Sequence, residues 1–241
     1  MNKRNYYKEL ENKIDEFQKN GVVPKLLLHV CCAPCSSHCL EFLRQYFDVT
    51  VFFYNPNITE DKEYRKRVAE EKRLIEEYNR QVDEQDFEGM HSDAKARKIS
   101  IIEGEYDPKE YFEAVKGYED IPEGGARCRK CFELRLRKTA ETAALNDFEY
   151  FTTSLTISPL KNADVLNEVG EEAAKFVNEK IAADDLSGKE ISFLPSDFKK
   201  KDGYKRSIEL SCRFGLYRQD YCGCGFSKAE RERQKTENKG E

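Results

Sequence analysis

The stretch KLLLHVCCAPCSSHCLEFLRQYF, residues 25–47, decides the fold. Its first part, KLLLHV, is a short continuous apolar run, which is typical of a parallel strand covered on both faces. The segment CCAPC at 31–35 ends this run, and the apolar residues that follow recur at helical spacing. The order strand, loop, helix predicts the first unit of an α/β protein, with a cysteine-rich loop directly after the strand.

Four later segments are rich in β-branched and aromatic residues, and segments with helical spacing alternate with them. The further strands are expected in VTVFFYNPNI at 49–58, KISIIEGEYD at 98–107, YFTTSLTIS at 150–158 and ISFLPSDF at 191–198. Strands that alternate with helices through right-handed crossovers predict an α/β fold, a Rossmann-like parallel sheet with helices on both faces. In such a sheet the working site lies beyond the carboxyl ends of the strands.

The length of 241 residues suits one large domain with appendages. We expect an N-terminal helical extension at 1–24, a single α/β catalytic domain at 25–227 and a charged, frayed tail at 228–241. No segment approaches ~18 consecutive apolar residues, and the charged start MNKRNYYKELENKIDEF contains no apolar signal-peptide core. We therefore expect a cytoplasmic protein that does not associate with membranes.

The nine cysteines are clustered. Four fall within residues 31–39, Cys128 and Cys131 form a C-x-x-C, and Cys222 and Cys224 form a C-x-C. Because thiols stay reduced in the cytoplasm, such clusters indicate metal binding or redox chemistry rather than structural disulfides. Cys39 and Cys212 are interpreted as small buried hydrophobic residues.

Four cysteine thiolates are the usual ligands of an iron–sulfur cluster, and a C-x-x-C supplies two from one turn. Cys128 and Cys131 are the first candidates, and Cys31 and Cys32 can complete the set. Zinc is the competing metal, since tetrahedral thiolate suits it as well. The two groups are about a hundred residues apart, unlike the paired turns of a zinc ribbon, and this favours iron and sulfide.

The pair Cys222 and Cys224 has two interpretations, which the residues leave open. A disulfide across one glycine is strained and easily reduced, which suits a reversible redox couple. Alternatively, the two thiolates bind a second metal ion together with a carboxylate such as Asp197 or Asp220.

Seven motifs resemble, in the same order, those of the QueH type of epoxyqueuosine reductase. They are HVCCAPCSS at 29–37, FYNPNI at 53–58, EYxxR at 63–67, GARCRKCFELRL at 125–136, FTTSLTISPLK at 151–161, FLPSDFKKKDGYKRS at 193–207 and LYRQDYCGCGFS at 216–227. The resemblance implies the last step of queuosine biosynthesis, the cobalamin-independent reduction of epoxyqueuosine to queuosine at the wobble position of tRNA. It also implies a [4Fe-4S] cluster, an external electron donor and a fold similar to adenine-nucleotide α-hydrolase-like (HUP) domains.

Carried over residue by residue, the resemblance assigns the cluster to Cys31, Cys32, Cys128 and Cys131. It assigns the proposed redox pair, or the ligands of a second iron, to Cys222 and Cys224. Cys35 lies where relatives vary and Cys212 matches no motif, so neither receives a role.

The reaction also needs groups that stabilise the departing oxygen and hold the RNA. Asp197 and Asp220 are candidates to ligate a metal or donate a proton. A wobble base can be splayed out and stacked on an aromatic plane, for which the candidates are Tyr54, Tyr204, Tyr217 and Tyr221. The net charge is −5, but two basic stretches supply candidate phosphate contacts: Lys130, Arg135, Arg137, Lys199, Lys200 and Lys201.

Two other functions compete with the reductase. An ATP-dependent tRNA-modifying enzyme of the PP-loop type would carry S-G-G-x-D-S after the first strand, whereas CCAPCSS lacks glycines that let backbone amides approach phosphate. A zinc-stabilised RNA-binding protein without catalysis is the second alternative, and it would be colourless where an iron–sulfur protein is brown.

Overall fold

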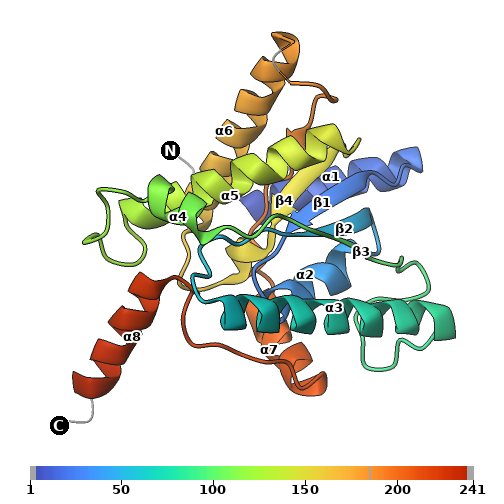
Figure 1. The fold of residues 1–241 in the computed structure, drawn as a ribbon. Helices are drawn as coiled ribbons and strands as arrows, with labels where there is room; N and C mark the ends of the chain where they lie inside the picture. Colours follow the sequence, from blue (N-terminus) through green and yellow to red (C-terminus); the bar gives the residue numbers. More distant parts are fainter. Residues whose placement is uncertain (1–3, 185, 238–241) are drawn as a thin grey trace.

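The computed structural model describes residues 4–184 and 186–237 (Figure 1). Within them lies one sheet of five parallel strands in the order β3-β2-β1-β4-β5. The strands are β1 (Lys25–His29), β2 (Asp48–Phe53), β3 (Ser100–Glu103), β4 (Tyr150–Thr153) and β5 (Ser192–Phe193). The predicted Rossmann-like sheet is confirmed. Its strand order reverses between β1 and β4, where open parallel sheets bind their ligands.

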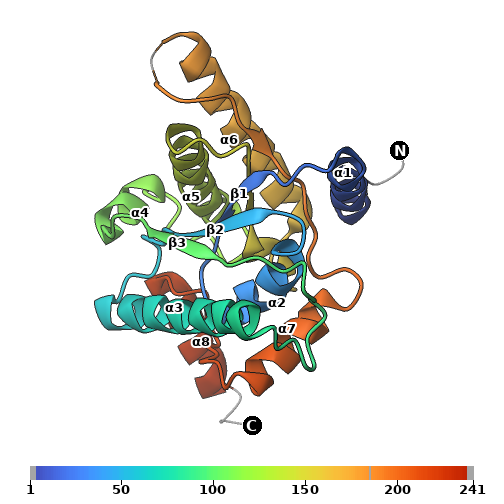
Figure 2. The ribbon, with the colours of Figure 1, turned by 90° about the vertical axis from the view of Figure 1, so that its right-hand side faces the viewer.

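Helices cover both faces of the sheet, as predicted (Figures 1 and 2). On one side lie α2 (Ala33–Leu43), α3 (Asp61–Glu84) and α7 (Gly203–Arg213). On the other lie α4 (Pro108–Ala114), α5 (Ala126–Leu145) and α6 (Ala163–Ala182). The remaining helices are α1 (Tyr6–Asn20), the short 3-10 helix η1 (Ser154–Ile157) and α8 (Gly225–Glu237). No helix of the described residues has the length and apolar character needed to cross a membrane.

The strand β1 shows why its sequence is continuously apolar. Leu26 and Leu28 pack into the core formed with α1, α2 and α3, whereas Leu27 packs into the core under α5 and α6. All three side chains are fully buried. Full burial of one such side chain contributes about 1.5–3 kcal/mol, so both faces of β1 hold the helix layers in place.

Three differences separate the structure from the expected elements. β4 ends at Thr153, because the Thr153 hydroxyl accepts the Leu155 N–H at 3.1 Å and starts η1. The segment after residue 228 forms most of α8 rather than a frayed tail, and Lys228–Glu60 and Lys235–Asp220 ion pairs, each 2.5 Å long, tie it to the body. The segment 203–218, which the sequence favours as one helix, is helical only as far as Arg213, where α7 ends, and residues 214–218 form a loop. Of the expected extension and tail, residues 1–3 and 238–241 lie outside the described residues.

Candidate active site

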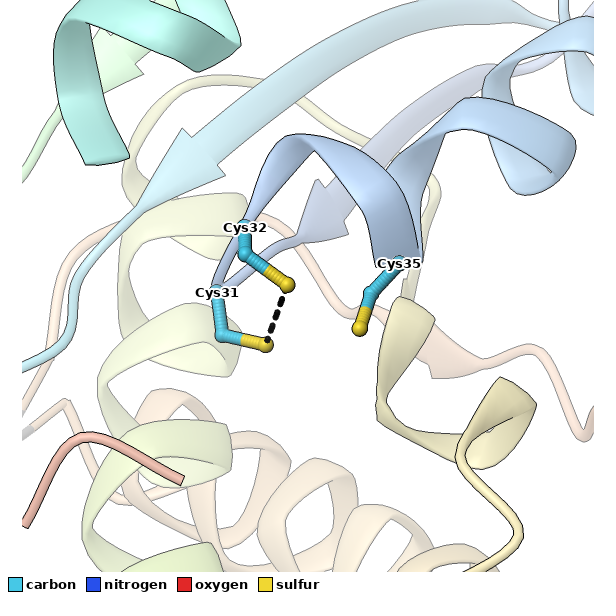
Figure 3. A group of neighbouring side chains, drawn as sticks. All are labelled: Cys31, Cys32 and Cys35. Carbon is cyan, nitrogen blue, oxygen red and sulfur yellow. Dashed lines mark hydrogen bonds between the residues drawn. The ribbon is translucent and has the colours of Figure 1, made fainter. Parts of the chain in front are cut away.

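Three cysteines meet where β1 passes into α2. The backbone of Cys32 is extended and Cys32 is the N-cap of α2, so Cys31 and Cys32 precede the helix while Cys35 lies in its first turn. The sulfur atoms of Cys31 and Cys32 are 3.8 Å apart, and all three sulfurs lie within 4.8 Å of one another. Figure 3 shows the three side chains turned toward a common space.

The three thiols of this trio differ in their pKa values. Hydrogen bonds from Cys32 and Cys35 hold the pKa of the Cys31 thiol well below its usual range. The hydrogen bond to Cys31 raises the pKa of Cys32 to about 12, and the pKa of Cys35 is raised for the same reason. The positive end of α2 also faces the trio and favours negative charge there. Cys31 is therefore the thiolate of the group.

The second pair lies in the first turn of α5. The Gly124 N–H donates to the Cys128 sulfur at 3.2 Å, and Nη1 of Arg135 lies 3.8 Å from the Cys131 sulfur. Burial raises the pKa of Cys131 to about 12 and also raises that of Cys128. Both thiols are therefore neutral at pH 7 until a metal ion displaces their protons, and as thiolates they place negative charge beside Arg135.

The third pair lies in the loop that leads into α8. Nη1 of Arg67 donates a hydrogen bond to the Cys222 carbonyl at 3.1 Å. The Ser227 N–H donates a hydrogen bond to the Cys224 sulfur at 3.4 Å. Gly223 has a φ of 115°, and a Cβ there would lie 2.9 Å from Ile58, so this position needs glycine. All nine cysteines of the chain are free thiols. Cys39 is buried as expected, whereas the expectation for Cys212 is wrong, because it lies exposed in the last turn of α7.

Two adjoining cavities bring these segments together. The thiol cavity, about 200 Å³, is lined by Cys128, Cys131, Cys222 and Cys224. The polar cavity, about 400 Å³, is lined by Cys31, Cys35 and Cys222, among others. Cys222 and Lys161 belong to both walls. The three cysteine groups, distant in sequence, therefore converge at the reversal point of the sheet.

Lys161 is the cation at the junction of the two cavities. It follows η1 and is partly buried, and it forms no ion pair within the described part of the chain. Burial lowers its pKa, but the negative charge of Cys222 and Cys31 outweighs burial and raises it. The ammonium group is thus held charged beside the thiols.

Arg135 does not lie at the surface, where a phosphate contact would need it. Its side chain is fully buried, with Nη2 donating to Asn55 Oδ1 at 2.7 Å and Nε donating to Nε2 of His29 at 3.3 Å. His29 itself is a satisfied core histidine, since its Nδ1 atom is hydrogen-bonded to Thr153 Oγ1 at 2.9 Å while Nε2 accepts from Arg135. Burial lowers the pKa of Arg135, but the Cys131 and Cys31 charges raise it above its usual value.

The other expected cations lie at or near the surface, and most have partners. Lys130 pairs with Glu133 at 2.8 Å, Lys199 with Asp197 at 3.0 Å and Lys201 with Glu11 at 2.5 Å. Arg137 is exposed and stacks over Phe176, and Lys200 is exposed.

The two expected carboxylates are separated. Asp197 is buried beside Lys199 and lines neither cavity, whereas Asp220 lines the polar cavity. A hydrogen bond from Lys235 lowers the pKa of Asp220. Asp220 is therefore ionised at neutral pH and does not act as a proton donor.

The expected stacking tyrosines are also divided. Tyr204 and Tyr221 line the polar cavity. Tyr54 is fully buried, and its hydroxyl donates a hydrogen bond to the Glu110 carboxylate. The Tyr217 hydroxyl donates a hydrogen bond to the Glu63 carboxylate, and the Lys66 ammonium group lies over the Tyr217 ring.

Sequence reasoning assigned no role to Cys35, Lys161 or Asn57. Cys35 completes a second C-x-x-C with Cys32, a spacing that was available in the sequence. Lys161 ends one of the seven motifs, but nothing in the sequence shows that its side chain turns inward. Asn57 is buried against the thiol cavity, and its Oδ1 atom has no hydrogen-bond partner among the described residues.

The donor set fits a thiolate-bound metal cluster. Seven of the nine cysteines belong to the trio or to the thiol cavity, and sulfur-only donors select iron–sulfur clusters or zinc. Arg135 and Lys161 supply positive charge that offsets the negative charge of several thiolates. These features define a class: an α/β protein whose site, at the sheet's reversal point, is built for thiolate redox or metal chemistry.

Comparison with known proteins narrows this class. The family model "Epoxyqueuosine reductase QueH" matches residues 26–230. A protein of that name from Streptococcus pyogenes is 39% identical over 225 residues, covering 93% of this chain and 78% of its own. Another from Staphylococcus epidermidis is 38% identical over 227 residues (93% and 85%), and one from Thermotoga maritima is 33% identical over 215 (88% and 94%). The chain belongs to the epoxyqueuosine reductase QueH family, a family of oxidoreductases.

Proposed function

We propose that this chain reduces epoxyqueuosine in tRNA to queuosine, using a [4Fe-4S] cluster held by Cys31, Cys32, Cys128 and Cys131. The observation that carries the proposal is the convergence of three cysteine groups on two joined cavities that share Cys222 and Lys161. Family membership supports the reaction, and the all-sulfur donor set supports the cluster.

The reaction converts the epoxide into an alkene. Both carbon–oxygen bonds break, a carbon–carbon double bond forms, and the oxygen leaves as water after taking up two electrons and two protons. An external low-potential reductant supplies the electrons. When bound, the cluster would supply one-electron transfer. A second iron held by Cys222 and Cys224 would supply Lewis acidity.

The protein's own groups handle charge and position. Lys161 holds an ammonium group at the junction of the cavities, where it stabilises negative charge on the departing oxygen and supplies a proton to it. Asn57 carries an unpartnered amide oxygen against the thiol cavity and accepts a substrate hydroxyl. Arg135 offsets the charge of the thiolates from the buried side.

Cys222 and Cys224 complete the site as a redox pair or as ligands of a second iron. Cys222 lines both cavities, and Asp220 lines the polar cavity with it. An ionised Asp220 suits the role of a metal ligand. Asp197, paired with Lys199 outside both cavities, has no such position.

The direct test is anaerobic incubation of the reconstituted protein with epoxyqueuosine-containing tRNA and a low-potential reductant, followed by mass spectrometry of the nucleosides. We expect queuosine to form. Its absence while the visible absorption of the cluster is intact would rule out the reductase, and binding of tRNA by a colourless zinc protein would favour the non-catalytic alternative.

Cysteine variants test the allocation of ligands. Cys128→Ala or Cys131→Ala should abolish the colour, whereas Cys222→Ala or Cys224→Ala should keep most of the colour and abolish turnover. Cys212→Ala is the matched control, because Cys212 is exposed and lines neither cavity. Bleaching by Cys222→Ala would assign that thiol to the cluster instead.

A further inference from the structure

The wall of the polar cavity combines thiols with basic and aromatic side chains. The thiols are those of Cys31, Cys35 and Cys222, and Lys161 lies among the lining residues with them. The C-terminal segments also contribute Tyr204 from α7, Arg218 and Tyr221 from the connecting loop, and Arg231 from α8. At about 400 Å³ the cavity lies within the usual range for ligand sites, roughly 300–1,000 Å³.

Arg218 and Arg231 have only neutral partners. Nη1 of Arg218 donates to the Ser211 hydroxyl at 3.2 Å, and Nε of Arg231 donates to the Asp220 carbonyl at 3.0 Å. Nη1 of Arg231 donates to the side-chain oxygen of Gln234 at 3.1 Å. Over residues 4–184 and 186–237, neither guanidinium forms an ion pair, so both keep donors for an anion.

The carboxylates of the cavity are already engaged. Asp220 pairs with Lys235 at 2.5 Å, and Glu123 accepts the Ser227 hydroxyl at 2.8 Å. Lys161, Arg218 and Arg231 thus outnumber the two acids. The basic residues that the sequence singled out contrast with them, since Lys130, Lys199 and Lys201 are paired.

We propose that the polar cavity admits a single-stranded nucleotide of the RNA substrate to the thiols. Arg218 and Arg231 bind the phosphates that flank this nucleotide. Tyr204 and Tyr221 provide aromatic faces for its base, so that the modified end of the base reaches Lys161 and Cys222. The proposal rests on the proposed function and names the part of the protein that holds the substrate of that reaction.

Charge and stacking predict different signatures in binding experiments. Each phosphate contact on a single strand adds about 0.7 to the slope of log affinity against log salt. A stacked base instead contributes roughly a five- to hundredfold gain in affinity that does not depend on salt. Arginine and tyrosine variants can therefore be told apart by one titration series.

The experiment measures binding of epoxyqueuosine-containing tRNA to the anaerobic, cluster-loaded protein at several salt concentrations. We expect Arg218→Gln and Arg231→Gln each to lower the slope by about 0.7 and to weaken binding roughly fivefold at 0.1 M salt. Tyr204→Leu should weaken binding at every salt concentration with the slope unchanged, and Tyr204→Phe should bind as wild type does. Lys175→Gln is the matched control, because Lys175 is exposed on α6, lines neither cavity and pairs with Glu179.

Visible absorption of each variant should equal that of wild type, because none of these side chains belongs to the cysteine groups. Slopes for both arginine variants equal to that of Lys175→Gln would overturn the proposal that the polar cavity binds the nucleotide. If wild type forms queuosine in that case, the proposed function stands and only the role of the polar cavity is refuted. If the arginine variants behave as expected but wild type forms no queuosine, the polar cavity binds the RNA and the proposed reaction is refuted.

Discussion

Arg44 and Arg135 are both fully buried, yet they face opposite environments. Arg44 is the C-cap of α2 and donates to the Tyr78 carbonyl at 2.9 Å, to Gln81 Oε1 at 2.9 Å and to the Ser92 hydroxyl at 2.5 Å. Its guanidinium also lies over the Tyr78 ring, 4.4 Å from the centroid. None of these partners is charged, and burial lowers the pKa of Arg44.

Arg135, on the other side of the sheet, has the reverse balance. It donates to Asn55 and His29 but also lies 3.8 Å from the Cys131 sulfur, and the negative charge of the cysteines raises its pKa despite burial. A buried cation is stable when it is paired. Arg44 is stabilised by neutral hydrogen-bond acceptors of the fold, whereas the only negative charges beside Arg135 are those of the thiolates. This difference distinguishes a structural arginine from an arginine that belongs to a reactive site.

The largest effect is expected at Lys161, the other cation beside the thiols. Lys161→Met removes the charge and the proton source at the cavity junction, so turnover should fall about 10²- to 10⁴-fold. Single-turnover kinetics of queuosine formation measure this. The visible absorption should stay unchanged, and Lys161→Arg should keep part of the rate; equal rates for Lys161→Met and wild type would contradict the role.

The second effect tests Arg135 directly. Arg135→Met leaves buried thiolates without their counter-charge, which costs roughly 3–5 kcal/mol. We expect iron to be lost to a chelator at least about a hundredfold more readily, with Arg135→Lys in between. Retention of iron equal to wild type would show that Arg135 serves the fold, as Arg44 does.

The third effect tests Arg44. Arg44→Met leaves the Tyr78 carbonyl and the Gln81 and Ser92 side chains without a donor. The free energy of unfolding should fall by about 1–3 kcal/mol, as measured by urea titration of the metal-free protein. Iron bound per folded chain should not change, and a loss of iron without a loss of stability would reverse the assignment of the two arginines.

The last effect concerns Glu71, a buried acid of α3 with no counter-charge among the described residues, and it changes stability with pH rather than activity. Its Oε1 accepts the Ser36 hydroxyl at 2.6 Å, its Oε2 has no partner among the described residues, and burial raises its pKa to about 8. The unfolded carboxyl titrates near 4.5, so between these values the unfolded chain releases a proton that the folded chain keeps. Stability therefore falls as pH rises through this window, by about 1.4 kcal/mol per pH unit.

Glu71→Gln should remove that slope. Urea unfolding of the metal-free protein at several pH values between 5.5 and 7.5 compares the two profiles. Parallel profiles would mean that Glu71 is ionised in the folded protein and has a cation that the structure does not show.

The sheet and the cysteine groups could be predicted because both depend on local patterns. KLLLHV fills two cores at once, and C-x-x-C spacing fixes two thiols on one turn. The two cations of the site differ in this respect. Arg135 stands four residues after Cys131 and seven after Cys128, so helical spacing already placed all three on one face of α5. No sequence pattern indicates that the Lys161 side chain points toward the cavities, because the side chain of a lysine in a loop is ordinarily exposed.

The most direct test of the central claim is the metal and sulfide content of the anaerobically purified protein. Convergence of the thiols on an iron–sulfur cluster predicts about four iron and about four acid-labile sulfide ions per chain, with broad absorption near ~400 nm, and the loss of all three in Cys131→Ala. A colourless protein that contains zinc and no sulfide would contradict the claim.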